Sequence, residues 1–166
     1  MNNVTVNTDG VSLPSWNDSF VSFTYKVLDE LNIDNWELSV LLCNDKIITG
    51  LNNQYRNKNE PTDILSFNLG ETITDGGRSI YFPGDIVISL DTLKENAEYF
   101  ETPEDEELRR LIIHGILHLD GMDHSNNLAA AKTVSDAQEP MLVLQEEILD
   151  KLKNERIIQD YNGEKK

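Results

Sequence analysis

The sequence predicts one α/β domain of mixed order, in which a small sheet packs with about five helices. The chain has 166 residues, the usual length of a single domain, and 39% of them are hydrophobic. Short strand-like segments alternate with longer segments whose apolar residues recur at helical spacing. We therefore expect a single domain over residues 1–155, followed by a loose tail over residues 156–166.

The first part of the chain is expected to hold two strands and two helices. Residues 2–7 (NNVTVN) form a short strand-like stretch, and residues 18–31 place Phe, Val and Leu side chains at helical spacing. Residues 36–43 (WELSVLLC) have the apolar run of a strand whose second half is buried. The Asn-Asp pair that follows can cap a helix, which should end near Arg56. The stretch NKNEPT, residues 57–62, then breaks the helical pattern.

Two further strands are expected around a long turn. Residues 63–69 (DILSFNL) have the alternation of a strand, and residues 71–79 (ETITDGGRS) are rich in Gly and Asp, which is typical of a turn. Residues 80–90 are strand-like, but Pro83 and Gly84 interrupt them. Because proline cannot donate to a neighbouring strand, we expect either an edge strand or a bulge there.

Three helices complete the expected order. They cover residues 91–100, about 103–120 and about 137–153. The middle helix contains LRRLIIHGILHL, which is apolar almost all round. A helix with this composition is typical of the centre of a domain, so we expect it to be buried.

Charge and cysteine content restrict the classes of protein that the chain can belong to. The formal net charge is −16, which disfavours nonspecific binding to nucleic acid or anionic membranes but leaves nucleic acid open as a substrate. No apolar stretch is long enough for a membrane helix, and the N-terminus lacks the pattern of a signal peptide. The single cysteine, Cys43, excludes an intrachain disulfide and is expected in the core. A cytoplasmic location is therefore expected.

All three histidines of the chain lie within HGILHLDGMDH, residues 114–124. His114 and His118 are one helical turn apart and should project from the same face of the central helix. Gly121 can end that helix in a left-handed conformation and let His124 return to the same point. Three imidazoles around one ion leave a position open for water, as in catalytic zinc sites. The alternative is that these are ordinary core histidines without a metal, which the spacing disfavours. If a metal is bound, Ni, Cu and Co suit such ligands as well as Zn does.

The same spacing occurs in metzincin peptidases, whose motif has a glutamate directly after the first histidine as the general base. In this chain that position is Gly115, which cannot accept a proton. The ligand pattern is therefore present while the peptidase base is missing. This difference favours substrates that need less help from a base than an amide does.

Several blocks of the sequence together resemble the YbeY family, bacterial rRNA maturation factors and single-strand endoribonucleases. HGILHLDGMDH resembles the family signature H-G-x-L-H-L-x-G-x-D-H. The three further blocks that match, in order, are LNNQYRNKNEPTDILSF (51–67), PGDIVIS (83–89) and MLVLQEEIL (141–149). The main departure is the segment 125–140, which is longer and less acidic than usual.

The resemblance implies a mixed four-stranded sheet and a zincin-like metal site at the end of the central helix. It implies metal-dependent cleavage of single-stranded RNA, 16S rRNA maturation and ribosome quality control. The metal, most simply Zn²⁺, is expected on His114, His118 and His124, and Arg56 matches the arginine essential to the family. The small ribosomal subunit with its basic proteins, and the GTPase Era, are the partners it suggests.

Two residues outside the histidine cluster are further candidates for the chemistry. The guanidinium of Arg56 could grip a phosphate and stabilise developing charge, or it could be a surface arginine at a helix C-terminus. Asp85 could orient a histidine, act as a base, or be a turn residue. Arg110 and Lys58 could form a local basic rim, although exposed cations are usually only solvated.

Three functions are compatible with these observations. The first is a metal-dependent endoribonuclease, in which a metal-activated water attacks a phosphodiester. The second is a metallopeptidase or another zinc hydrolase, against which Gly115 speaks. The third is a noncatalytic ribosome assembly factor with a structural metal.

Overall fold

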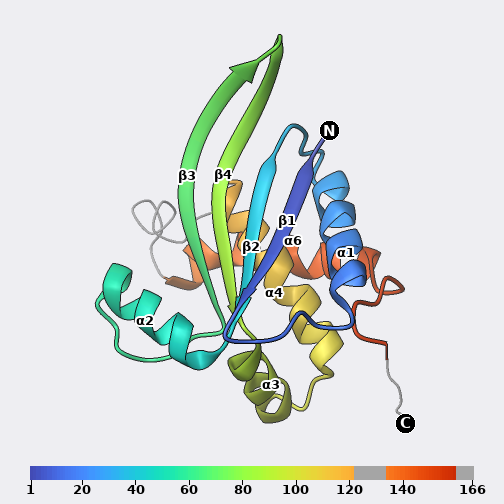
Figure 1. Ribbon diagram of the computed structural model, residues 1–166. Helices are drawn as coiled ribbons and strands as arrows, with labels where there is room; N and C mark the ends of the chain where they lie inside the picture. Colours follow the sequence, from blue (N-terminus) through green and yellow to red (C-terminus); the bar gives the residue numbers. More distant parts are fainter. Residues whose placement is uncertain (122–133, 160–166) are drawn as a thin grey trace.

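The computed structural model describes residues 1–121 and 134–159, and it confirms an α/β domain with a mixed four-stranded sheet and five helices in this part of the chain (Figure 1). The strands are β1 (Asn3–Asp9), β2 (Glu37–Cys43), β3 (Ile64–Asp75) and β4 (Arg78–Ser89). The helices are α1 (Asn17–Glu30), α2 (Asp45–Arg56), α3 (Leu90–Tyr99), α4 (Glu104–Leu119) and α6 (Val134–Lys151). Among the described residues, none of the helices combines the length and apolar character needed to cross a bilayer.

The sheet has the order β1-β2-β4-β3, with β3 antiparallel to β4 and the other pairs parallel. Its two faces carry separate apolar clusters, because successive side chains of a strand point to opposite faces. Ile86 belongs to the larger cluster with α1, α4 and α6, while its neighbour Val87 belongs to a smaller cluster with α2. Cys43 is buried in the smaller cluster, and burial raises the pKa of its thiol to about 11. The prediction of a core cysteine is confirmed.

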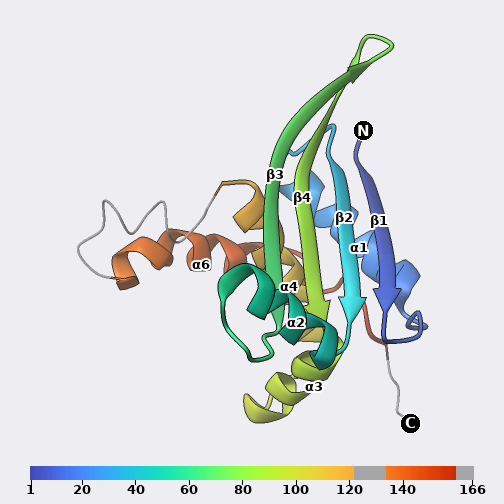
Figure 2. The same cartoon turned by 60° about the vertical axis from the view of Figure 1, so that its left-hand side comes forward.

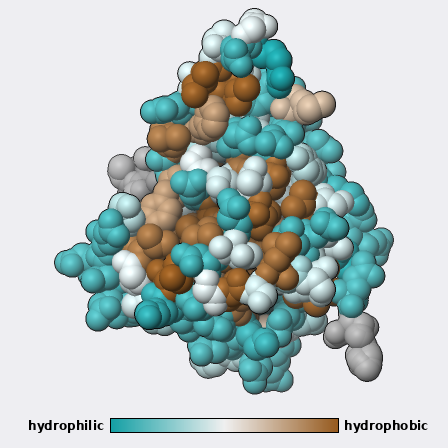
Figure 3. Space-filling view, viewed as in Figure 1, coloured by the Kyte–Doolittle hydropathy of each residue, from teal (hydrophilic) through white to brown (hydrophobic). Residues whose placement is uncertain are grey.

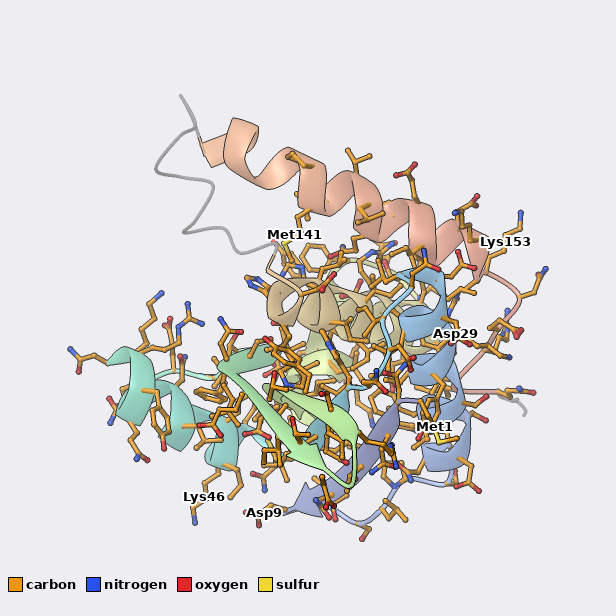
Figure 4. The ribbon with its side chains drawn as sticks, turned by 90° about the horizontal axis from the view of Figure 1, so that it is seen from above. Met1, Asp9, Asp29, Lys46, Met141 and Lys153 are labelled. Carbon is orange, nitrogen blue, oxygen red and sulfur yellow. The ribbon has the colours of Figure 1, made fainter. Side chains whose placement is uncertain are left out.

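Helix α4 is the central element of the larger layer, as its composition predicts. It lies between α6 and the sheet (Figure 4), and Ile112, Ile113 and Ile116 are fully buried. Burying each side chain of this size contributes roughly 1.5–3 kcal/mol, so the helix is a rigid support. The helix approaches the sheet closely at Gly115. A Cβ atom there would lie 3.0 Å from the Cδ1 atoms of both Ile64 and Ile86.

The hairpin of β3 and β4 is longer than expected, and the prediction of a turn over residues 71–79 was wrong. Only Gly76 and Gly77 form the turn, with φ angles of 58° and 83°. Residues on either side pair in register, for example Ile73 with Ile80. The two strands extend beyond the rest of the sheet (Figure 2). The polar residues here alternate with β-branched ones, and we interpreted their charge and glycine content as a loop.

Strand β4, which contains Pro83 and Gly84, lies inside the sheet. Of the two alternatives predicted for this strand, an edge position or a bulge, the edge position was therefore wrong. The edge is β3. The register of β3 against β4 shifts between Asn68 and Glu71, directly opposite Pro83. An irregularity in the partner strand accommodates a residue that has no N–H to donate.

Replacing Gly84 with alanine should destabilise the protein by at least about 2 kcal/mol, because backbone strain and a steric clash combine. Gly84 has a φ of +138°, and a Cβ atom there would lie 1.9 Å from the carbonyl oxygen of Phe67. The measurement is the free energy of unfolding in a chemical denaturant. Gly50→Ala is the control, since no atom near this helical glycine lies within 4 Å of the added Cβ. Equal stability of Gly84→Ala and wild type would contradict this close approach of the strands.

The packed part of the chain extends beyond the expected domain boundary at residue 155. Ile157 is 1% exposed. The N–H groups of Ile157 and Ile158 donate to a buried carboxylate oxygen of Asp105, at 2.6 and 2.8 Å. These contacts fix residues that we expected to belong to a loose tail. Residues 160–166 lie outside the described part of the chain.

Candidate active site

A cleft of about 640 Å³ crosses the edge of the sheet at strand β3. Helix α2 lies on one face of the sheet and α4 on the other, and both contribute side chains to the cleft. The lining residues are Tyr55, Arg56, Asp63, Ile64, Leu65, Ser66, Phe67, Asn68, His114 and His118. The fold thus brings together three of the residues that the sequence predicted for the site, one from α2 and two from α4.

The two described histidines lie side by side on α4. The ring centroids of His114 and His118 are 4.7 Å apart, and both side chains are half-buried. Nδ1 of His114 lies 2.8 Å from Oε1 of Gln145 on α6. Adjacent imidazoles of this kind fit the donor set of a divalent transition metal. The prediction that both rings share one face of the central helix is confirmed.

Arg56 is the last residue of α2 and is exposed at the rim of the cleft. The chain leaves the helix through Asn57, which has left-handed backbone angles and whose N–H bonds to carbonyl groups of the last turn. Among the described residues Arg56 forms no ion pair. The guanidinium is therefore positioned to meet an anionic group that enters the cleft.

Comparisons with known proteins identify the family of this chain. The family model described as Endoribonuclease YbeY matches residues 3–153. The chain belongs to the YbeY family. Similar proteins, each named Endoribonuclease YbeY, occur in Treponema denticola (48% identical over 137 residues, 82% of this chain and 83% of the relative) and Treponema pallidum strain Nichols (45% over 150 residues, 90% and 89%). The relative from Borreliella afzelii is 46% identical over 136 residues, covering 81% of this chain and 85% of that protein.

The solution structure of TM1509 from Thermotoga maritima is also similar. It aligns with a TM-score of 0.52 and 26% identity, covering 100% of both chains. This likeness and the observed topology support the predicted fold class. The described residues of the sequence blocks that resemble the YbeY family lie mainly on the end of α2 and on β3, β4, α4 and α6. Of these elements, α2, β3 and α4 contribute side chains to the cleft.

The third expected ligand, His124, lies outside the described residues, as do residues 125–133 of the departing segment 125–140. Within residues 1–121 and 134–159, no group of three His, Cys, Asp or Glu side chains is close enough to hold an ion. The helix does end as predicted: α4 stops at Leu119, and Gly121 has a φ of +95°. The chain of this YbeY-family protein thus leaves the helix one residue after His118.

The structure does not bring Asp85 to the histidines. Asp85 is exposed on the face of the sheet that carries α2, whereas Ile86 points toward α4. Its carboxylate lines a second cavity of about 340 Å³, together with Ser39, Leu41, Leu51, Tyr55, Phe67 and Val87. Hydrophobic side chains gather on the face of the molecule shown in Figure 3. A direct contact between Asp85 and His114 would need the opposite face of β4.

The basic rim considered for Arg110 and Lys58 is not formed, because Arg110 is paired with carboxylates. The guanidinium of Arg110 donates to Glu106, Glu107 and Glu146 at 3.1, 2.8 and 2.9 Å. These contacts raise the pKa of Arg110, and Arg110 holds the pKa of the Glu146 carboxyl below its usual range. The charge of Arg110 is therefore compensated within the fold.

Asp63 is a site residue that the sequence analysis did not single out, since it appeared there only as the first residue of an expected strand. Its half-buried carboxylate lines the cleft with the histidines. Nδ2 of Asn96 donates to it at 3.4 Å, and the hydroxyl of Thr62 lies at 3.5 Å. Its position directly before an edge strand, inside the block NKNEPTD, is the signal that could have indicated it.

Proposed function

We propose that this chain is a metal-dependent endoribonuclease that cleaves single-stranded RNA and acts in 16S rRNA maturation and ribosome quality control. The observation that carries the proposal is the cleft that His114 and His118 line together with Arg56. Membership of the YbeY family and the activity for which the relatives are named, an endoribonuclease, support the same reaction. The place of action would be the cytoplasm, where the single buried Cys43 stays reduced.

His114, His118 and His124 would hold the ion, and Zn²⁺ is the one that three imidazoles suit best. When bound, such an ion acidifies a water molecule and offsets negative charge on the phosphodiester. The rigid, buried core of α4 would hold the two described rings in place without a change of fold.

Arg56 would bind the scissile phosphate. A guanidinium can donate to two phosphate oxygens at once, and its benefit grows as negative charge builds up in the transition state. Asp63 offers a fixed acceptor in the same cleft for a hydroxyl or water proton. Tyr55 and Phe67, whose rings meet edge to face at 5.1 Å, present aromatic surface on which a base could stack.

The net charge of −16 bears on the partners. A strongly acidic surface does not hold RNA by general attraction, so binding would depend on local contacts and on a larger assembly. We propose that the small ribosomal subunit, through its basic proteins, presents the rRNA strand to the cleft. Era remains a further candidate partner.

The metallopeptidase alternative is the weaker one. A metzincin peptidase has a glutamate as general base at the position of Gly115. An added Cβ atom there would lie 3.0 Å from side-chain atoms of Ile64 and Ile86. The close contact of helix and sheet leaves little room for a side chain at this position. The noncatalytic assembly factor is the stronger rival, because it too would use a metal at the end of α4.

Removing the metal should abolish RNA cleavage. Purified protein is expected to carry about one zinc per chain by elemental analysis. Treatment with a chelator and desalting should stop cleavage of a single-stranded RNA oligonucleotide, and added Zn²⁺ should restore it, with desalted but unchelated protein as the control. Equal cleavage at zero metal content would overturn the metal dependence. Stoichiometric metal without cleavage, also in the presence of ribosomal subunits, would favour the assembly factor.

A further inference from the structure

A chain of polar contacts leads from the surface of α4 through α6 to the first histidine of the site. Nε of Arg110 donates to Oε2 of Glu146 at 2.9 Å. Nε2 of Gln145 donates to the same carboxylate at 3.1 Å, and Oε1 of Gln145 lies 2.8 Å from Nδ1 of His114. Gln145 is only 5% exposed, although it is polar. A buried amide with both ends engaged is suited to hold a neighbouring ring in one orientation.

The contacts determine which end of the amide faces the histidine. The carboxylate of Glu146, which is paired with Arg110, can only accept hydrogen bonds. The NH₂ group of Gln145 must therefore face Glu146, and its carbonyl oxygen must face His114. Since a carbonyl oxygen only accepts, Nδ1 of His114 must carry the proton.

The geometry points to Gln145 as a positioning residue: it holds His114 in the tautomer with the proton on Nδ1, in which Nε2 is the ring nitrogen that can coordinate a divalent cation. The value of this role to the reaction rests on the metal centre of the proposed function. Hydrogen-bond partners of metal-binding histidines fix the tautomer and ring orientation, and their loss typically costs about 10–100-fold in metal affinity.

Gln145 and His114 are 31 positions apart in the sequence, and they meet because α6 packs along α4. The contact comes from an element outside the histidine motif. It explains why a glutamine is buried at this point of an otherwise apolar helix face, between Met141 and Ile148, which are 1% and 3% exposed.

The tautomer can be measured directly, because the full chain contains only three histidines. In ¹⁵N-histidine-labelled protein without metal, long-range ¹H–¹⁵N spectra distinguish a proton on Nδ1 from one on Nε2. His114 should show the Nδ1–H form in wild type and a shift toward the Nε2–H form in Gln145→Leu. Gln145→Glu keeps an acceptor and should keep the Nδ1–H form. An Nε2–H signal for His114 in wild type would overturn the inference.

Zinc affinity gives the second readout, by competition with a chromogenic chelator. Gln145→Leu should bind zinc about 10–100-fold more weakly than wild type, and Gln145→Glu should retain most of the affinity. Glu147→Leu, an exposed position on the same helix, is the control and should bind as wild type does. Equal affinity of Gln145→Leu and wild type would overturn the positioning role. If wild type binds no zinc, the proposed metal centre fails, while the tautomer spectra still decide the role of Gln145.

Discussion

The Arg56→Ala variant is expected to lose about 10²–10³-fold in kcat for cleavage of single-stranded RNA while keeping its fold and its metal. The side chain lines the cleft with His114 and His118. Because it is exposed, its removal leaves no hole in the core. Among the described residues its charge is not used in an ion pair, in contrast to Arg110. The guanidinium is thus able to bind phosphate oxygens, whose charge grows in the transition state.

Two further variants separate transition-state binding from general attraction. Arg56→Lys keeps the charge but not the two-pronged donor, so it should recover only part of kcat. Arg78→Ala removes one exposed cation at the start of β4, outside the cleft, and should cleave at the wild-type rate. If both alanine variants raise KM equally and leave kcat unchanged, Arg56 acts only through its charge. Wild-type kcat in Arg56→Ala would show that the guanidinium has no part in the reaction.

The local features of the site could be predicted from the sequence, because helical periodicity acts over a few residues. The spacing of His114 and His118 and the helix end at Gly121 depend only on such short-range geometry, and the structure agrees with both. The buried character of α4 followed from its composition for the same reason. The placing of Arg56 beside the histidines came from the family resemblance, since no local rule relates residues so far apart.

The errors concern contacts that depend on register and on long-range packing. Asp85 was considered as a partner of a histidine, but its side chain points to the other face because alternation along β4 directs Ile86 toward α4. Gln145 could not be predicted, because its contact with His114 depends on how two helices pack. The hairpin beyond residue 70 has one exposed residue after another, so it lacks the alternating burial that reveals a strand.

The His118→Ala variant is expected to lose its zinc and, with it, detectable RNA cleavage. A structural zinc site binds with roughly 10–16 kcal/mol shared among four ligands, so one ligand contributes on the order of 3 kcal/mol, about a hundredfold in affinity or more. The ring of His118 lies 4.7 Å from that of His114 on the same wall of the cleft. Elemental analysis and cleavage of an RNA oligonucleotide, each beside wild type, measure the two losses. A variant that keeps stoichiometric zinc would show that His118 is not a ligand.

The same variant distinguishes the enzyme from an assembly factor with a structural metal. Helix α4 is held by buried side chains such as Ile113 and Leu117, and alanine favours a helix, so metal-free His118→Ala should unfold at the temperature of metal-free wild type. A structural metal predicts instead that wild type itself unfolds when its zinc is removed. In cells, the enzyme hypothesis predicts that Arg56→Ala and His118→Ala both stop 16S rRNA maturation. The assembly-factor hypothesis predicts that Arg56→Ala leaves 16S rRNA maturation intact, because the guanidinium lies at the cleft rim and supports no part of the core.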